Sequence, residues 1–390
     1  MKLTSNAALR LAAAAITCAA ILAPAAALAS VGSAATAGSR ASRAWSARPV
    51  TAYVVNSSSG TVTPIDTAVG KAGTAINVKR YPYAIAITPN GKTAYVTNTL
   101  LNTVTPIQTA TGAVGNAINV GEDPQVIAIT PNGKTAYVVN VGSGTVTPIQ
   151  TATDKAGKAI SIGVGSFPGD IAITPNGKTA YVTSSSGVTP INTATNKAGQ
   201  LIKNSAGAIA ITPDGKTAYV LNGGGLVTPI QTATNKAGKA IKIPYSNTFV
   251  PSGVPGQVLI AITPDGKTVY VASQSAGTVT PIRTATNKAG RAIKVGKDPF
   301  GIAITPDGKT VYVASQDSNT VTPIWTATNK AGQAINVGSL PWAIAITPNG
   351  KTVYVVNNGS NTVTPICIAT SKEGKPINVG FAPVSIAITP

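Results

Sequence analysis

One short segment recurs along almost the whole of this 390-residue chain. The hexapeptide TAYVVN at Thr51 returns seven more times with small changes, at intervals of 42, 42, 44, 38, 51, 42 and 42 residues. Repeats of about 40–45 residues that consist of short strands are typical of the blades of a β-propeller. The sequence therefore predicts an all-β chain in which each copy forms one blade. The later copies begin at Thr93, Thr135, Thr179, Thr217, Thr268, Thr310 and Thr352.

Each copy divides into four short segments, which we name strands A to D. Strand A reads IAIT, as at residues 85–88, and a PNGK or PDGK turn joins it to strand B, TAYVVN. Strand C reads TVTPI and strand D reads AINVG. The A–B turn suits a hairpin, because proline fixes one backbone angle and glycine takes the left-handed conformation. We expect each blade to be a four-stranded antiparallel sheet, with the small side chains of strand A innermost.

The phase of the repeat predicts how the ring closes. The repeats open with strand B at Thr51 and end with strand A at residues 385–389, and seven complete blades lie between them. The leftover N-terminal strands and the leftover C-terminal strand would complete an eighth blade, which removes the open sheet edge. We therefore predict a single eight-bladed propeller over residues 51–390. Seven blades with an unpaired remnant is the alternative.

Every strand C carries a proline near its end, which is unusual inside a sheet. Proline has no N–H to donate to a neighbouring strand, so inner strands normally exclude it. We expect either a bulge at this point or a strand D that pairs only after the proline. The prolines are Pro64, Pro106, Pro148, Pro190, Pro229, Pro281, Pro323 and Pro365.

The composition limits the chemistry that the chain can perform. It has no histidine, which excludes Ser-His-Asp and Cys-His catalysis and any histidine-ligated metal. Its 11 acidic residues leave few carboxylates for metal binding or for acid–base pairs. We therefore expect a protein that is not an enzyme, with no catalytic residues, no metal and no cofactor.

The N-terminal residues are typical of an export signal. Lys2 and Arg10 precede and flank an apolar run at residues 11–22, and Ala27-Leu28-Ala29 is a cleavage pattern of small residues. We expect residues 1–29 to be a signal peptide, residues 30–50 a disordered linker, and the mature chain to be secreted or associated with the cell envelope, without a transmembrane segment. Export would leave one cysteine, Cys367, which we expect to be a buried, inert thiol, with an intermolecular bridge as the alternative.

The repeats resemble the YVTN-type β-propeller family of surface-layer and secreted bacterial and archaeal proteins. The resemblance rests on TAYVTN at residues 93–98, TPDGKTAYVLN at residues 212–222 and VTPIDTA at residues 62–68, and it extends over all eight copies. The family commonly has an acid in strand C, but here only Asp66 keeps it. The resemblance implies extracellular binding or surface display, with no common catalytic set to transfer.

Basic residues are expected to gather on one face of the ring. Antiparallel strands place the A–B turns and the C–D loops together, and these connections hold 18 of the 25 basic residues of the repeats against five acidic ones. This face can attract a polyanion, although solvated lysines also keep a β-rich protein soluble. The A–B turn lysines are the hypothetical binding residues: Lys92, Lys134, Lys178, Lys216, Lys267, Lys309 and Lys351.

The opposite face should collect the aromatic residues outside strand B. They fall in the D–A loops, which lead into the innermost strands, so we expect them at the mouth of the central channel. They suit sugars or peptides if exposed; the alternative is that they pack loop on loop between blades. The hypothetical binding residues here are Tyr83, Phe167, Tyr245, Phe249, Phe300, Trp342 and Phe381, together with the long loop at residues 243–257.

These features lead to one functional expectation and two alternatives. We expect a secreted, non-catalytic binding scaffold for cell-envelope polyanions or glycans, as a monomer without specific nucleic-acid binding. A structural surface-layer or envelope protein is the first alternative. A lactonase-like or lyase-like propeller enzyme is the second, and it is disfavoured because lyase types use histidine and lactonase types gather acids and Asn around a metal. Asp123 and Asp298 are the only equivalent acids near the channel mouth, and with carbonyl help they could hold Ca²⁺ weakly.

Overall fold

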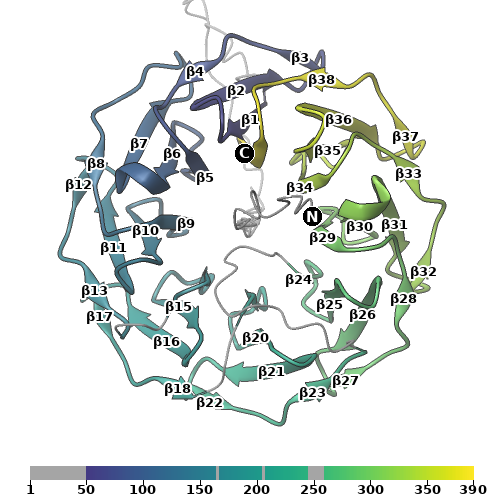
Figure 1. The fold of residues 1–390 in the computed structure, drawn as a ribbon. Coiled ribbons are helices and arrows are strands. Elements are labelled where there is room, and N and C mark those ends of the chain that lie inside the picture. Colours follow the sequence, from purple (N-terminus) through teal and green to yellow (C-terminus); the bar gives the residue numbers. More distant parts are fainter. Residues whose placement is uncertain (1–49, 164–166, 204–206, 245–258) are drawn as a thin grey trace, which may run out of the picture.

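The computed structural model describes residues 50–163, 167–203, 207–244 and 259–390. These residues form eight antiparallel sheets arranged as blades around a central axis (Figure 1). The prediction of an eight-bladed propeller is confirmed, and the seven-bladed alternative is wrong. Among the described residues, no helix has the length and apolarity needed to cross a membrane.

Strand A of each blade lies nearest the axis and has an open edge toward the channel (Figure 1). Five of the eight inner strands have six residues and begin with proline, whereas the other three have only three or four. The five long strands are consecutive around the ring, because β29, β34, β39, β5 and β9 contact one another in that order. The inner strands are β5 (Pro82–Ile87), β9 (Pro124–Ile129), β14 (Asp170–Ile173), β19 (Ile209–Ile211), β24 (Ile260–Ile262), β29 (Pro299–Ile304), β34 (Pro341–Ile346) and β39 (Pro383–Ile388).

Strand B is the most buried strand of every blade. Its tyrosine is at most 2% exposed in all eight copies, so these tyrosines belong to the core. Burial on both faces explains why the sequence alternation is weak and nearly every position is apolar or hydrogen-bonded. The strands are β1 (Thr51–Asn56), β6 (Thr93–Asn98), β10 (Thr135–Asn140), β15 (Thr179–Ser184), β20 (Thr217–Asn222), β25 (Thr268–Ser273), β30 (Thr310–Ser315) and β35 (Thr352–Asn357).

Strand C pairs with strand B without interruption, and its proline lies opposite the buried tyrosine. The missing proline N–H faces strand D, because the carbonyl of Pro64 accepts a hydrogen bond from the Gly73 N–H on that side. The strands are β2 (Thr61–Asp66), β7 (Thr103–Gln108), β11 (Thr145–Gln150), β16 (Gly187–Asn192), β21 (Leu226–Gln231), β26 (Thr278–Arg283), β31 (Thr320–Trp325) and β36 (Thr362–Cys367).

Strand D is split into two short pieces that pair with the two ends of strand C on either side of the proline. Strand C itself has no bulge, and strand D pairs on both sides of the proline and not only after it, so both expectations for this position are wrong. In the second blade the first piece is reduced to one bridge, between Ile107 and Val114. The pieces are β3 (Lys71–Ala72), β4 (Ile76–Asn77), β8 (Ile118–Asn119), β12 (Lys155–Ala156), β13 (Ile160–Ser161), β17 (Lys197–Ala198), β18 (Ile202–Lys203), β22 (Lys236–Ala237), β23 (Ile241–Lys242), β27 (Lys288–Ala289), β28 (Ile293–Lys294), β32 (Lys330–Ala331), β33 (Ile335–Asn336), β37 (Lys372–Glu373) and β38 (Ile377–Asn378).

The ring closes by sharing one blade between the two ends of the described chain. The C-terminal strand β39 pairs with the N-terminal strand β1, and the Thr51 N–H donates to Oγ1 of Thr389. A ring that closes in this way leaves no unpaired blade edge around its circumference. This pairing is the closure that the phase of the repeat predicts.

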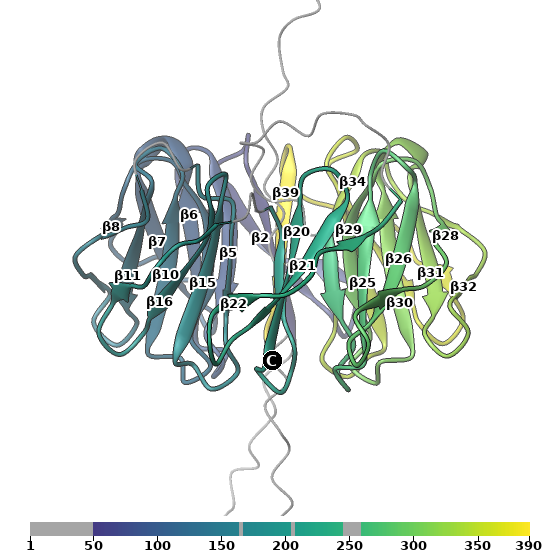
Figure 2. The same cartoon turned by 90° about the horizontal axis from the view of Figure 1, so that it is seen from below.

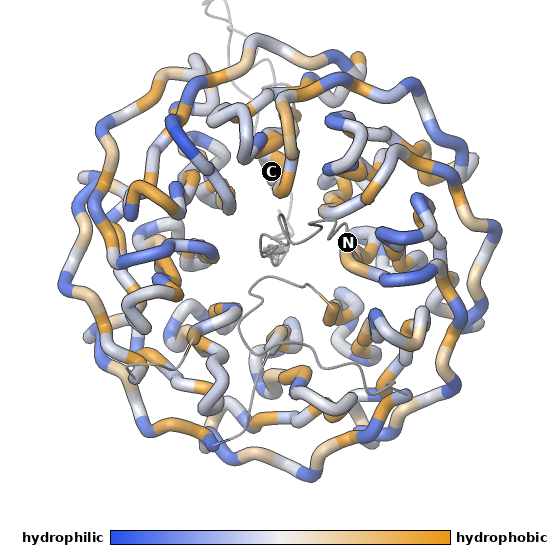
Figure 3. The backbone as a smooth tube through the Cα atoms, in the orientation of Figure 1, coloured by the Kyte–Doolittle hydropathy of each residue, from blue (hydrophilic) through white to orange (hydrophobic). Residues whose placement is uncertain are grey.

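The core lies between the blades. Apolar residues run along the strands, and hydrophilic residues concentrate at the connections (Figure 3). Each buried tyrosine belongs to one blade and reaches the C–D loop of the next: the Tyr270 hydroxyl, for example, donates to Oδ1 of Asn329 at 2.7 Å. Burial raises the pKa of Tyr270 to about 12, so the hydroxyl stays protonated and remains a donor. The tyrosines therefore link neighbouring blades.

The connections gather at the two ends of the ring, as the side view shows (Figure 2). One end carries the A–B turns and the C–D loops, which hydrogen-bond to each other within a blade, as between Thr232 and Gly215. The other end carries the B–C and D–A loops. Two B–C loops contain a single turn of 3-10 helix, η1 (Thr99–Leu101) and η2 (Gln316–Ser318).

Candidate functional site

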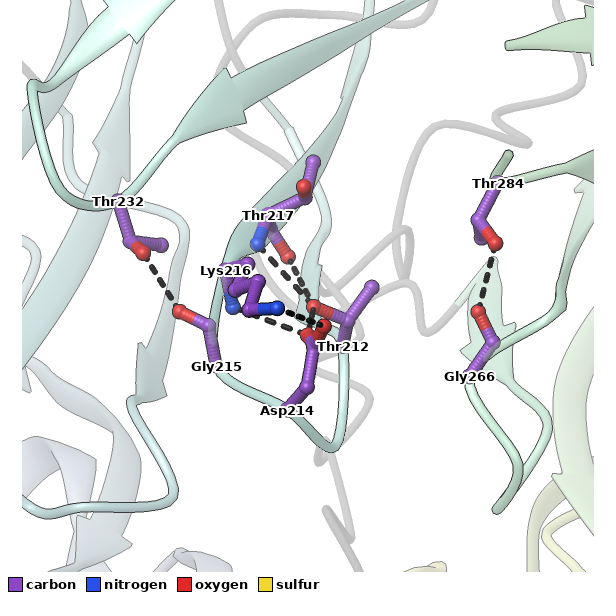
Figure 4. Close-up of polar contacts among 8 residues, drawn as sticks. All are labelled: Thr212, Asp214, Gly215, Lys216, Thr217, Thr232, Gly266 and Thr284. Atoms are coloured by element: carbon purple, nitrogen blue, oxygen red, sulfur yellow. Dashed lines mark hydrogen bonds and ion pairs between the residues drawn. The ribbon is translucent and has the colours of Figure 1, made fainter. Parts of the chain in front are cut away.

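The seven A–B turns have nearly the same internal hydrogen bonds, and Figure 4 shows those of the turn before β20. In the turn before β20, Oγ1 of Thr212 donates to Oδ1 of Asp214 at 2.6 Å and accepts the Thr217 N–H at 3.1 Å. Oδ1 of Asp214 also accepts the Lys216 N–H at 3.0 Å. Gly215 has φ near +71°, and a Cβ there would meet the proline of the preceding blade at 3.3 Å. The motif therefore specifies both the turn and the contact with the next turn around the ring.

Asparagine replaces aspartate in four of these seven turns and makes the same bonds. Oδ1 of Asn90 accepts the Thr88 hydroxyl at 2.7 Å and the Lys92 N–H at 3.0 Å. In the three aspartate turns, the lysine ammonium also lies 3.4–3.9 Å from the carboxylate. The Thr212 hydroxyl first, then the Lys216 N–H, lowers the pKa of Asp214. Asn and Asp turns thus differ in charge but not in backbone geometry.

The seven lysines predicted as binding residues all occupy the equivalent position of an A–B turn, and all are exposed. The structure brings them to one end of the ring together with the C–D loop lysines. Cys367 lies at the same end, where strand C passes into the C–D loop. It is exposed, so the expectation of a buried thiol is wrong, and hydrogen bonds with Thr370 lower its pKa.

The opposite end is less regular, because bulges precede most of the inner strands. In β29, Pro299 pairs with Ser315 and Gly301 with Ala314, so Phe300 is an extra residue between them. Trp342 is the extra residue at the same place in β34. A bulge re-aims its side chain relative to the regular strand, and bulges are frequent beside active sites. Here it turns the aromatic rings toward the neighbouring blade.

The structure separates the hypothetical aromatic residues into two groups. Tyr83 and Phe300 are only 8% and 4% exposed, and Trp342 is half-buried and stacks on Phe300 with ring centroids 4.7 Å apart. Phe167 and Phe381 are 55% and 69% exposed. Packing between blades therefore accounts for the first group. Tyr245, Phe249 and most of the loop at residues 243–257 lie outside the described residues.

Asp298 is the acid best placed for chemistry on this face. It precedes Pro299 with φ near +51°, a strained conformation for a residue before proline. Its carbonyl accepts the Gln316 N–H at 2.9 Å, and the Lys297 N–H donates to Oγ of Ser318 at 2.7 Å. These bonds hold the D–A loop against η2, which carries Asp317. Burial first, then the charge of Asp317, raises the pKa of Asp298.

Asp123 occupies the equivalent position before β9. Its Oδ2 accepts the side-chain N–H of Gln125 at 2.7 Å, and its own N–H donates to Oδ1 of Asn102 at 3.0 Å. Burial raises its pKa, and the bond from Gln125 opposes that effect. Tyr83 is close enough that the charge of Asp123 adds to burial in raising the tyrosine pKa. This loop is a self-contained hydrogen-bonded group.

The two acids cannot hold one ion. Three inner strands separate β9 from β29 in either direction around the ring, so Asp123 and Asp298 lie on opposite sides of the channel (Figure 1). Within the described ranges, no three His, Cys, Asp or Glu residues lie close enough together to bind a metal. The described residues therefore do not fit the metal centre that is expected of a lactonase-type propeller, and the proposed Ca²⁺ pair is wrong.

Asp170 is a buried acid that the sequence analysis missed. It begins β14 and is 5% exposed, at the position that holds Ala84, Val126 or Gly301 in other blades. Its carboxylate accepts the Ile171 N–H at 2.7 Å and the Ile209 N–H of the next blade at 3.0 Å. The sequence signal that could have revealed it is the aspartate at the start of DIAIT, because the other copies have no acid at this position.

Comparison with known proteins gives one family match and many matches to solved structures. The family model described as Lactonase, 7-bladed beta-propeller, matches residues 227–333, about a quarter of the chain. No curated protein matches the sequence. The matched segment runs from β21 to the connection after β32 and includes Asp298 and Phe300.

The similar solved structures have low sequence identity to this chain. Hydrazine synthase of Kuenenia stuttgartiensis is 24% identical, with a TM-score of 0.59 over 74% of this chain and 96% of that one. The dihydro-heme d1 dehydrogenase NirN is 13% identical, with a TM-score of 0.75 over 86% and 74%. A putative 6-phosphogluconolactonase of Bacteroides fragilis is 19% identical, with a TM-score of 0.56 over 88% and 98%. At these identities the likeness establishes the β-propeller fold.

These findings correct the functional expectation. The lactonase family match, together with neighbours that are named as a lactonase, a dehydrogenase and a synthase, points to an enzyme-like propeller. The expectations of a non-catalytic scaffold and of a protein that is not an enzyme are therefore contradicted, and the lactonase-like alternative is favoured. The missing histidine was given too much weight, because a carboxylate with a raised pKa can also act as a general base.

Proposed function

We propose that this chain is a lactonase-like hydrolase that opens a cyclic ester at the end of the propeller where the D–A loops lie. The observation that carries the proposal is the lactonase family match at residues 227–333, because this segment contains Asp298 and the bulge that places Phe300. The structure adds a half-buried carboxylate, Asp298, whose pKa is raised by burial first and then by the charge of Asp317.

Asp298 is the general base in this proposal. Its carboxylate takes a proton from a water molecule while the water oxygen attacks the lactone carbonyl carbon. The ring C–O bond then breaks, and the same proton passes to the leaving alkoxide, so one lactone and one water give one hydroxy acid. A raised pKa brings a carboxylic acid closer to neutral pH, where a base of this kind transfers protons most effectively.

The neighbouring residues keep Asp298 in place. The bonds from Gln316 to the Asp298 carbonyl and from Lys297 to Ser318 fix the loop against η2. Trp342 cannot rotate freely, because it stacks on the buried ring of Phe300, and its half-buried indole offers an apolar surface beside the loop. This surface suits the carbon skeleton of a lactone ring.

The full chain should be tested with a panel of lactones, including γ-butyrolactone, δ-gluconolactone and 6-phosphogluconolactone, with acid release followed in a pH-stat. D298N should lower kcat/KM by about 10²–10⁴-fold, the usual effect of losing a general base. D123N is the matched control, since Asp123 precedes the equivalent proline with the same backbone conformation, and it should keep most of the activity.

Two results would count against this proposal. Acid release no faster than in buffer, for every lactone, would contradict the lactonase activity. Equal losses in D298N and D123N would leave the activity but remove Asp298 as the base. Thermal unfolding of both variants should accompany the kinetics, so that loss of the fold is not mistaken for loss of catalysis.

We further propose that the repeats are of the YVTN type and that the chain is exported. The eight copies of the TAYVVN motif support the first statement. The pattern of basic, apolar and small residues over residues 1–29 supports the second. Sequencing the N-terminus of the protein from culture medium or from a cell-envelope fraction tests export, and cleavage is expected after Ala29.

A further inference from the structure

We propose that the end of the ring that carries the A–B turns and the C–D loops docks on an anionic phospholipid membrane. We call this end the basic face. Its 18 basic residues exceed its five acidic residues by 13. A surface with one dominant sign of charge attracts an oppositely charged surface, and lysines close to anionic lipids contribute strongly to membrane binding.

The cations of the A–B turns are unevenly compensated around the ring. Each lysine of the three Asp turns lies within 3.9 Å of the carboxylate in its own turn. These turns belong to three consecutive blades, which contain β20, β25 and β30. The other four turns have asparagine in place of that carboxylate, so their lysines have no acid within the turn: Lys92, Lys134, Lys178 and Lys351.

The shape of the basic face suits a flat partner better than a thread-like one. The A–B turns and the C–D loops lie at the same end of the ring, the lower end in Figure 2, where the C-terminus lies. A flat anionic surface can contact every blade at once, whereas a linear polymer can follow only part of the circle. The A–B turns contain no aliphatic or aromatic side chain apart from proline, so the contact is electrostatic and should not insert into the bilayer.

The path of the chain points in the same direction. The carbonyl of Val50 accepts the N–H of Thr67, a residue of the first C–D loop, so the segment before Val50 joins the propeller at the basic face. The sequence of residues 30–49, which remains after the proposed cleavage, has three basic residues and no acidic residue. Docking by this face leaves the D–A loops, and the proposed Asp298 site, on the side away from the bilayer.

The test is cosedimentation of the full chain with vesicles of phosphatidylcholine, with and without phosphatidylglycerol. Binding should require phosphatidylglycerol and should fall steeply as salt is raised to about 0.15 M. Changing Lys92, Lys134, Lys178 and Lys351 to Gln should weaken binding by on the order of 10²-fold, at about fivefold per lysine near the membrane. The matched control removes four exposed lysines from the opposite face, Lys79, Lys242, Lys294 and Lys297, and should change binding only a few-fold.

A second variant tests the proposal through a gain of binding, which a folding defect cannot produce. D214N, D265N and D307N together remove three negative charges from the basic face. The turns should keep their shape, because Asn90 and its equivalents already make the same hydrogen bonds. This variant should bind the anionic vesicles at least ten-fold more tightly.

Three outcomes would overturn the proposal. Equal losses in the two lysine variants would mean that total charge, and not this face, controls binding. No gain from the three Asp→Asn changes would exclude a role for the A–B turns. Binding of polygalacturonate through the same lysines, with no binding to the anionic vesicles, would mean that the face docks a soluble polymer and not a membrane.

Discussion

The two ends of this propeller carry different kinds of sequence. At the basic face, the A–B turn is repeated seven times with the same hydrogen bonds, and only the exchange of Asn for Asp distinguishes one of these turns from another. At the opposite end, no two D–A loops are alike, and six of them place a residue other than glycine at positive φ directly before a proline. The buried Asp170 and the half-buried Asp123 and Asp298 all lie at this variable end.

The contrast shows where specific chemistry can arise in a repeat protein. A feature that occurs in every blade is explained by the fold, since each copy must make the same contacts. A feature that occurs in one blade needs its own explanation. Asp170 is a feature of the second kind, and so is Asp298 in combination with Asp317, whereas the turn lysines act only through their number. The predictions below test this difference through stability, from the largest expected effect to the smallest.

Asp170 should be the acid whose loss is most costly. D170A removes the carboxylate that accepts the N–H groups of Ile171 and Ile209, and it leaves both donors buried without that acceptor. Hydrogen bonds to a charged group contribute about 1.5–3 kcal/mol, so the free energy of unfolding should fall by about 2–3 kcal/mol. Denaturant unfolding measures it.

Ser385 provides the control for this prediction, because it occupies the equivalent position in β39. It is fully buried, and its Oγ has no hydrogen-bond partner among the described residues. S385A should therefore change the free energy of unfolding by less than about 0.5 kcal/mol. A similar loss in both variants would mean that Asp170 contributes volume and not a link between blades.

The repeated turn should show a smaller but reproducible effect. T212V removes a hydroxyl that bonds to Asp214 and to Thr217, at a cost of about 1–2 kcal/mol. T88V removes the same group from an asparagine turn and should cost less, because the acceptor there is uncharged. A larger loss in T88V than in T212V, measured by calorimetry, would contradict a contribution from the carboxylate charge.

The links between blades should each contribute about 1 kcal/mol. Y270F removes the hydroxyl that donates to Asn329, and N329A removes its acceptor. In a double-mutant cycle the two changes should be non-additive, because they remove the same bond. Additive losses would mean that the tyrosine stabilises the ring through ring packing alone.

Much of this architecture could be predicted from the sequence because the same strand pattern occurs eight times. The blade count, the closure of the ring and the buried tyrosines follow from a period and a pattern that need no side-chain detail. The bulges at Phe300 and Trp342 could not be foreseen, since a bulge depends on how one extra residue is accommodated between two blades. Asp170 was missed for a related reason: attention to the repeated residues hides the single position that departs from them.

The catalytic expectation failed for a different physical reason. Excluding histidine excludes particular mechanisms, but it says nothing about the pKa of a carboxylate that the fold partly buries. That pKa depends on burial and on Asp317, which lies 19 positions away in sequence and comes close only through the pairing of β29 with β30. Composition alone cannot contain that information.

The smallest expected effect concerns how stability depends on pH. This dependence should have opposite signs for the acids at the two ends of the ring. Burial raises the folded-state pKa of Asp298, so its ionisation costs stability as pH rises above about 3.9. D298N should therefore stabilise the protein at pH 7 and be neutral at pH 3.

Asp214, Asp265 and Asp307 have lowered pKa values, so their stabilisation is present above pH 3.9 and lost as pH falls through the lowered values. Changing these three to Asn should destabilise at pH 7, by only a few tenths of a kcal/mol because the groups are exposed. Thermal unfolding from pH 3 to pH 7 measures both, and the same sign at both ends would contradict the opposite directions of these pKa shifts.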